Sequence, residues 1–420
     1  MNKETRFSRR KLLIGAAAAL GSMILARPRR WLGMPGALAQ DSMPYRIYLP
    51  IIVIPTKPRV VHVRDAGVTS WNGVDPFYEA VDQTVVDSMV QTGLQLLTGQ
   101  SSWADIWSTL FGRVHPEGYS AGQKIALKVN LNNASRYYCA THGNLIDALP
   151  QPILALISGM IAAGVQPGDV TVYDSIRVIP SYLRDPIWMV YPGVKFVGTG
   201  SCPGVIPPGH GADSSLRVSF SEPYGYLKDR QLADVLYDAT YVINMPIIKR
   251  HGGDGANPVT LGFKNHFGSL GVIGGSGYDD LHYYINTSSS LYRTTYSPLT
   301  DIYRNPNILD KTILILGDGL YGGTGPSSPP ITSWSIFGGP GNSLFFGVDP
   351  VATDCVMADL IVAEGLVSKA HTYDYLFCAQ EAGLGRCEGT RGDPGGAPLQ
   401  TPYGSGYTAI EYIRVDTTSG

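Results

Sequence analysis

The feature that most constrains the fold is a regular alternation of short strand-like runs with longer helical segments. We expect strands at 60–64, 124–132, 170–175, 194–198, 239–246, 311–317 and 344–348, and helices near 76–98, 151–164, 350–364 and 372–382. This alternation is typical of an α/β fold with a mostly parallel sheet flanked by helices. The stretch YTAIEYIRV at 407–415 is one further candidate strand.

Composition agrees with a folded domain that is rich in turns. The chain has 420 residues, of which 44% are hydrophobic and 16% charged, which excludes a disordered protein. Gly and Pro together make up 80 residues, yet no triplet or heptad period suggests collagen or a coiled coil. We therefore expect one main domain with Gly/Pro-rich loops, and a loop over 320–342.

The N-terminus has the pattern of a twin-arginine export signal. Arg9 and Arg10 directly precede the apolar run LLIGAAAALGSMILA, and Ala37-Leu38-Ala39 is a candidate cleavage site. The apolar run is short and weakly hydrophobic for a membrane span, which needs about 20 residues. The sequence thus predicts a signal peptide over 1–39 and the twin-arginine translocase as a partner during export. The mature protein is then expected in the periplasm or outside the cell, with no stable membrane span once the signal is cleaved. An uncleaved membrane anchor is the alternative.

The rest of the chain divides into three parts. Residues 40–57 contain several prolines and are expected to form a spacer or an edge strand. The main α/β domain is predicted over 58–390, and a C-terminal extension over 391–420. Without residues 1–39 the chain carries 24 basic and 33 acidic residues, a net charge of −9, which argues against nucleic-acid binding.

The five cysteines give no metal or cluster motif. None of them forms CxxC, so a ferredoxin-type iron–sulfur cluster has no support from spacing. One disulfide is plausible outside the cytoplasm, and Cys378 and Cys387 are the nearest pair in sequence. Cys355, inside an apolar helical stretch, is expected to be a buried free thiol.

Polar and basic residues gather where the predicted strands end. Ligands of open α/β sheets bind beyond the carboxyl ends of strands, which draws attention to Lys128, Asn130 and the segment 242–271. That segment carries Lys249, Arg250, His251, Asp254, Lys264, Asn265 and His266. Cations that follow an apolar strand in a net-acidic protein predict a site for phosphate or carboxylate, although a solvated basic loop has the same composition.

Carboxylates at other strand ends make a metal site an alternative interpretation. His251 and His266, with Asp254, Asp318 or Asp349, have side chains suited to a divalent metal, but the spacing matches no zinc motif. Asp349 is also explained as the N-cap of a helix that begins at Pro350. GDGLYG at 317–322 has the glycine spacing of the dinucleotide-binding motif but not its structural context, because GTGPSSPP follows it and cannot form the required helix. No serine-hydrolase, P-loop or cysteine-protease motif is present.

At these stretches the chain resembles a bacterial and archaeal family called domain of unknown function 362. The resemblance rests on GQKIALKVNLNN, GVQPGDVTVYDS, ATYVINMPIIKRHGGDGANPVTLGFKNHFGSL, ILDKTILILGDGLYGGTGP, LFFGVDPVATDCVMADLI and EAGLG, and it covers roughly 58–385. It implies that the segments around Lys128, Lys249, Lys264, Asp318 and Asp354 are shared motif positions. No catalytic assignment comes with it. Some relatives carry a ferredoxin-like domain with CxxC clusters; this sequence lacks those cysteines, so the resemblance implies no iron–sulfur role.

We therefore expect an exported protein, either an enzyme acting on a small anionic substrate or a non-catalytic protein that binds an anion, a metal or a redox partner. In the first case His251, His266 and Asp318 are the catalytic candidates. Lys128, Asn130, Lys249, Lys264 and Asn265 would bind the substrate. His251, Asp254 and Asp349 are the candidate ligands if the cofactor is a divalent metal.

Overall fold

The computed structural model describes residues 57–131, 139–140, 144–252, 259–271, 279–326, 328–391 and 406–417. The predicted signal peptide and all of the 40–57 segment except residue 57 lie outside these ranges, as do Asp254 and parts of the C-terminal extension. Within the described residues, no helix combines the length and the apolar character needed to cross a bilayer.

The centre of the protein is a mixed, mostly parallel sheet, as the alternation predicts. Its main path runs β13-β1-β12-β11-β8-β2-β3-β4-β5, and β9 joins it beside β11. Along this path only β12 runs against its neighbours, because it pairs antiparallel with both β1 and β11. The strands of the path are β1 (Arg59–Asp65), β2 (Lys124–Lys128), β3 (Val170–Asp174), β4 (Lys195–Gly198), β5 (Val205–Ile206), β8 (Ala239–Asn244), β11 (Thr312–Gly323), β12 (Ser343–Gly347) and β13 (Glu411–Thr417).

Four further short strands of the described residues lie off this path. The strand β9 (Ile247–Arg250) pairs with β11 and with β10 (Val259–Thr260). A separate two-stranded sheet joins β6 (Arg217–Val218) to β7 (Arg230–Gln231).

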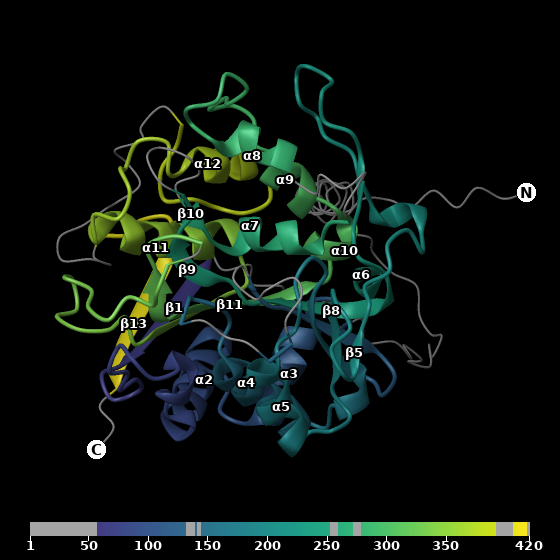
Figure 1. Ribbon diagram of the computed structural model, residues 1–420, viewed down its shortest axis with the longest axis vertical. Helices are drawn as coiled ribbons and strands as arrows, with labels where there is room; N and C mark the ends of the chain where they lie inside the picture. Colours follow the sequence, from purple (N-terminus) through teal and green to yellow (C-terminus); the bar gives the residue numbers. More distant parts are fainter. Residues whose placement is uncertain are drawn as a thin grey trace, which may run out of the picture. The chain divides into compact units, whose positions relative to one another are not determined.

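Helices cover both faces of the sheet (Figure 1). One face carries α2 (Gln83–Thr98), α3 (Trp103–Phe111), α4 (Pro150–Ala162) and α5 (Ser181–Val190). The opposite face carries α7 (Gly262–Asn265), α8 (Asp279–Ile285), α9 (Pro298–Tyr303), α11 (Pro350–Ala363) and α12 (Asp374–Glu381). The remaining short helices are α6 (Asp234–Asp238), α10 (Pro306–Leu309), η1 (Phe77–Glu79), η2 (Pro167–Asp169), η3 (Ser214–Leu216) and η4 (His266–Ser269).

The period of two along each strand divides the apolar core into two layers. In β12, Leu344 and Phe346 belong to the cluster that contains the buried residues of α2, whereas Phe345 belongs to the cluster that contains those of α11. Because both faces of the central strands are covered, these strands are apolar throughout, as expected for a buried parallel sheet. The helix α11 begins as predicted: Asp349 is its N-cap and accepts a hydrogen bond from Ala352 N (2.8 Å).

Two predictions about local structure are wrong. The strand β11 continues to Gly323, so the first part of the predicted 320–342 loop is strand; pairing with β9 outweighs the weak strand propensity of the glycines. The disulfide joins Cys139 to Cys202, and Cys378 and Cys387 are free. Cys139 and Cys202 follow β2 and β4, whose carboxyl ends lie at the same edge of the sheet, so nearness in the fold and not in the sequence decides the pairing.

Candidate functional site

A cavity of about 260 Å³ lies at the carboxyl ends of β2 and β3, where the sequence places its polar strand-end residues. Asp174 ends β3, Asn130 and Arg177 follow β2 and β3 within three residues, and the segment from the end of β9 to α8 supplies the other polar lining. That second set consists of His251, Thr260, Lys264, Asn265 and His282.

A buried ion pair lies at this wall, and its carboxylate lines the cavity. Lys128 Nζ lies 3.0 Å from Asp174 Oδ2 and also donates to Val129 O (2.5 Å) and Asn265 Oδ1 (3.3 Å). Burial lowers the pKa of Lys128, while the carboxylate of Asp174 acts in the opposite direction. Lys128 therefore already balances the negative charge of Asp174 before any ligand enters the cavity.

Close approach of η4 to this ion pair requires a glycine. A Cβ atom at Gly268 would lie 2.5 Å from Lys128 Nζ and 2.7 Å from Asp174 Oδ2. The carbonyl oxygen of Gly268 accepts a hydrogen bond from Ser175 N (2.7 Å), which fixes η4 to the end of β3. A larger residue at this position would separate the two elements.

Side-chain amides connect the buried lysines. Asn265 Oδ1 accepts from Asn130 Nδ2 (3.0 Å), and Asn265 Nδ2 donates to Asn244 Oδ1 (2.8 Å). Asn130 Oδ1 in turn accepts from Lys249 Nζ (2.7 Å). The structure thus brings four of the predicted substrate-binding residues, Lys128, Asn130, Lys249 and Asn265, into one hydrogen-bonded cluster.

Lys249 is the second fully buried lysine of the cluster. Burial lowers its pKa to about 8, and the positive charges of Arg177 and Lys128 act in the same direction. Asp147 is the largest opposing influence. Lys249 is consequently far closer to losing its proton at neutral pH than a surface lysine.

Lys264 differs from the other two buried lysines in the surroundings of its amino group. Its side chain lines the cavity and the residue is 6% exposed, but its Nζ has no hydrogen-bond partner within the described ranges. The nearest stabilising group is the ring of Phe267, whose centroid is 5.6 Å from Nζ. Burial and the positive charge of Lys249 hold the pKa of Lys264 well below its usual range.

Lys264 and Asn265 are positioned by a helix of a single turn that depends on a distant carboxylate. Asp354 of α11 accepts hydrogen bonds from Gly262 N (2.8 Å) and Phe263 N (3.1 Å) at the start of α7. An isolated turn is unstable without such support. Burial raises the pKa of Asp354 to about 7, although these two bonds act against that shift. In the sequence, Asp354 stands out through the family resemblance as a shared motif position, and nothing there indicates its contact with α7.

Two histidines stack at the wall. The rings of His251 and His282 have centroids 5.4 Å apart and an interplanar angle of 18°, and His251 Nδ1 lies 2.8 Å from Thr260 Oγ1. Burial and the charge of Lys264 hold the pKa of His251 far below its usual range, so the imidazole is neutral at pH 7. A neutral imidazole offers one N–H donor and one acceptor.

Sequence reasoning missed Arg177 and His282. Arg177 follows β3 within three residues, so the rule used for the other strand ends would have found it. His282 lies on α8 and enters the site only through tertiary packing, for which the sequence contains no signal.

Two of the predicted catalytic residues are not part of the described cavity wall. His266 is fully buried; its Nδ1 lies 3.1 Å from Ser269 Oγ, and burial lowers its pKa to about 3. Asp318 lies within β11 and accepts from Leu320 N (3.0 Å), and burial raises its pKa to about 7. Among the catalytic candidates, His251 alone lines the cavity within the part of the chain that the structure describes.

The predicted metal ligands are not brought together by the residues that can be placed. Asp349 caps α11 and also accepts from Arg386 N (3.2 Å), and burial raises its pKa to about 6. Asp254 lies outside the described residues. Within the described ranges, no group of three His, Cys, Asp or Glu side chains is close enough to hold a metal ion.

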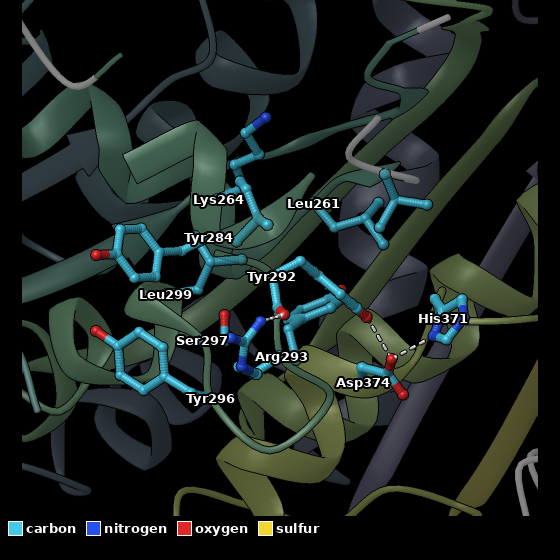
Figure 2. A pocket seen from close by; sticks show the side chains of 13 residues that line it. Leu261, Lys264, Tyr284, Tyr292, Arg293, Tyr296, Ser297, Leu299, His371 and Asp374 are labelled. Carbon is cyan, nitrogen blue, oxygen red and sulfur yellow. Dashed lines mark hydrogen bonds and ion pairs between the residues drawn. The ribbon is translucent and has the colours of Figure 1, made fainter. Parts of the chain in front are cut away.

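A second, smaller pocket of about 30 Å³ lies on the other side of Lys264 (Figure 2). Four tyrosines contribute to its lining, and Asp374 accepts hydrogen bonds there from the Tyr292 hydroxyl and from His371 Nδ1 (2.8 Å). Figure 2 shows the ammonium group of Lys264 pointing away from these side chains. The aliphatic stem of Lys264 therefore forms part of the aromatic pocket, and its Nζ is directed elsewhere.

Comparison with known proteins gives one match. A family model described as Domain of unknown function (DUF362) matches residues 125–359, which is more than half of the chain. Neither the curated proteins nor the solved structures contain a significant match.

Proposed function

Because the chain belongs to the DUF362 family, whose matched region includes every described residue of the cavity wall, we propose that this shared region binds a small anion, a carboxylate or a phosphate, in the cavity. The observation that carries the proposal is the buried ammonium group of Lys264, which has no partner within the described residues. Burying an unpaired cation is costly, and a bound anion would supply the missing counter-charge.

The charges of the described wall support an anion over a cation. Arg177 and Lys264 are the basic residues of the lining, and the single carboxylate among its described residues, that of Asp174, is paired with Lys128. His251 adds a neutral imidazole. The guanidinium group of Arg177 suits the two oxygens of a carboxylate or phosphate.

The size of the cavity supports a small ligand. About 260 Å³ is below the usual range for drug-sized molecules, so the ligand would have only a few non-hydrogen atoms. If the protein is an enzyme, we propose that His251 hydrogen-bonds this ligand as a neutral imidazole, because a pKa far below the usual range makes it a weak general base at neutral pH. A non-catalytic binding protein is the alternative, and it is distinguished by whether a ligand released from the purified protein is recovered chemically unchanged.

Calorimetric titration of the full chain with inorganic phosphate and with pyruvate tests the binding proposal. We expect Lys264→Met and Arg177→Met each to weaken binding about tenfold or more, because each removes a charge-assisted hydrogen bond. Lys311→Met is the matched control, since Lys311 is a partly buried lysine that donates to the carbonyl oxygens of Leu236 (2.7 Å) and Tyr237 (3.1 Å), away from the cavity. Unchanged affinity in both cavity variants, or no binding to the wild-type protein, would contradict the proposal.

We also propose that the chain is exported by the twin-arginine route. The support is the sequence of residues 1–39 together with the Cys139–Cys202 disulfide, a bond that persists mainly in oxidising compartments. Replacing Arg9 and Arg10 by lysine should retain the full-length chain in the cytoplasm, as measured by cell fractionation. Export that continues unchanged in this variant would exclude the route.

A further inference from the structure

The three lysines at the site differ in what surrounds their amino groups. Lys128 Nζ is paired with Asp174 (3.0 Å), and Lys249 Nζ donates to Asn130 (2.7 Å). Neither of these lysines lines the cavity, whereas Lys264 does. Lys264 thus combines access to the cavity with an amino group that no described acceptor engages.

An amino group in these surroundings is a potential nucleophile. A lysine that is desolvated and lies near a second cation loses its proton easily, and the free amine then has a lone pair available for attack on a carbonyl carbon. Both conditions hold at Lys264, which is 6% exposed and whose pKa is lowered by burial and by Lys249. At Lys128 the carboxylate of Asp174 opposes loss of the proton, and the amino group is already engaged by hydrogen bonds.

We infer that Lys264 forms an imine with the carbonyl group of a small 2-oxo carboxylate whose carboxylate is held by Arg177 in the same cavity. This inference rests on the proposed anion site and adds the chemical class of its ligand. The Nζ lone pair forms a bond to the carbonyl carbon to give a carbinolamine, and the carbonyl oxygen leaves as water with the two protons of the amine. The step needs no oxidant, reductant or metal.

The placement of the groups favours a molecule that is both a carbonyl compound and an anion. Arg177 and Lys264 reach the cavity from different elements, the end of β3 and the helix α7. Because both residues line one cavity, a 2-oxo carboxylate offers a group to each of them: its carboxylate to Arg177 and the adjacent carbonyl carbon to Lys264. Inorganic phosphate would satisfy the charges but offers no carbon for the amine to attack.

Reductive trapping tests the inference. The full chain is incubated with pyruvate and sodium cyanoborohydride, which reduces an imine to a stable secondary amine, and is then examined by intact-mass measurement and peptide mapping. We expect one adduct per chain, located on Lys264. Lys264→Arg keeps the positive charge but has no amine that forms a reducible imine, so it should lose the adduct while circular dichroism and calorimetric pyruvate binding show a folded, occupied site.

Lys311 provides the internal reference for reactivity. Burial lowers its pKa to about 8, but its amino group is occupied by two carbonyl oxygens away from the cavity, so we expect no adduct there. Labelling of Lys311 or of surface lysines as readily as Lys264 would overturn the inference. Pyruvate binding without any adduct would overturn the imine and leave the anion site intact, whereas the absence of both binding and adduct would overturn both.

Discussion

Removing one partner of the buried Lys128–Asp174 pair should destabilise the protein far more than removing both. At 3.0 Å and an effective dielectric constant of about 20, the attraction between two unit charges is about 5.5 kcal/mol. Asp174→Asn keeps the shape but leaves the fully buried ammonium group of Lys128 without a counter-charge. We therefore expect Asp174→Asn and Lys128→Met each to lower the free energy of unfolding by about 3–5 kcal/mol, and the double variant to lie within about 1–2 kcal/mol of wild type.

Urea unfolding at neutral pH, followed by far-ultraviolet circular dichroism, measures these values as a double-mutant cycle. The pair Arg59–Glu411 is the matched control: its distance is 3.1 Å, but its side chains are 34% and 41% exposed. Solvent screening should reduce the coupling energy there to about 1 kcal/mol or less. Additive effects of Lys128→Met and Asp174→Asn, or a coupling energy no larger than that of Arg59–Glu411, would refute the reasoning.

Three further outcomes follow from buried groups. Lys264→Met should raise the free energy of unfolding by about 1 kcal/mol or more, because it removes a buried amino group that has no hydrogen-bond partner in the described part of the chain, and a lower urea midpoint would contradict this. Burial raises the pKa of Asp318 from 3.8 to about 7, so the stability it contributes is complete below pH 3.8 and is lost as the pH rises through 7. Asp318→Asn should remove that loss, seen as a smaller fall in melting temperature between about pH 5 and pH 8 than in wild type; an unchanged profile argues against it. The Sγ atoms of Cys355 and Cys387 are 3.2 Å apart. Treatment with diamide should therefore join these two cysteines in a disulfide, with loss of two hydrogens, in addition to the existing Cys139–Cys202 bond. Peptide mapping that recovers only the Cys139–Cys202 disulfide would contradict this.

Local patterns predicted the elements of the sheet but not their order. Strand runs such as 170–175 and 344–348 correspond to β3 and β12 within a residue or two, because burial of both faces makes them continuously apolar. The sequence has no signal for β12 lying antiparallel between β1 and β11, since that arrangement depends on contacts between distant segments. The wrong cysteine pairing has the same origin, because it used separation along the chain in place of position in the fold.

The candidate site was predicted to the extent that it lies at strand ends. Lys128 and Asn130 follow this rule, and the structure places them with Lys249 and Asn265 in one cluster. Asp318 is also near a strand end in the sequence, but β11 continues past it and encloses it within the sheet. The rule fails there because where a strand stops is decided by its neighbours.

The pairing of β1 bears on how the chain matures during synthesis. This strand, at Arg59–Asp65, forms its ladders with β12 and with β13, which ends at Thr417. Both partners are translated hundreds of residues after β1, and contacts of such separation form slowly. A ribosome-bound chain that stops before residue 343 therefore leaves β1 unpaired, and this segment should remain open to proteases or chaperones until translation is nearly finished.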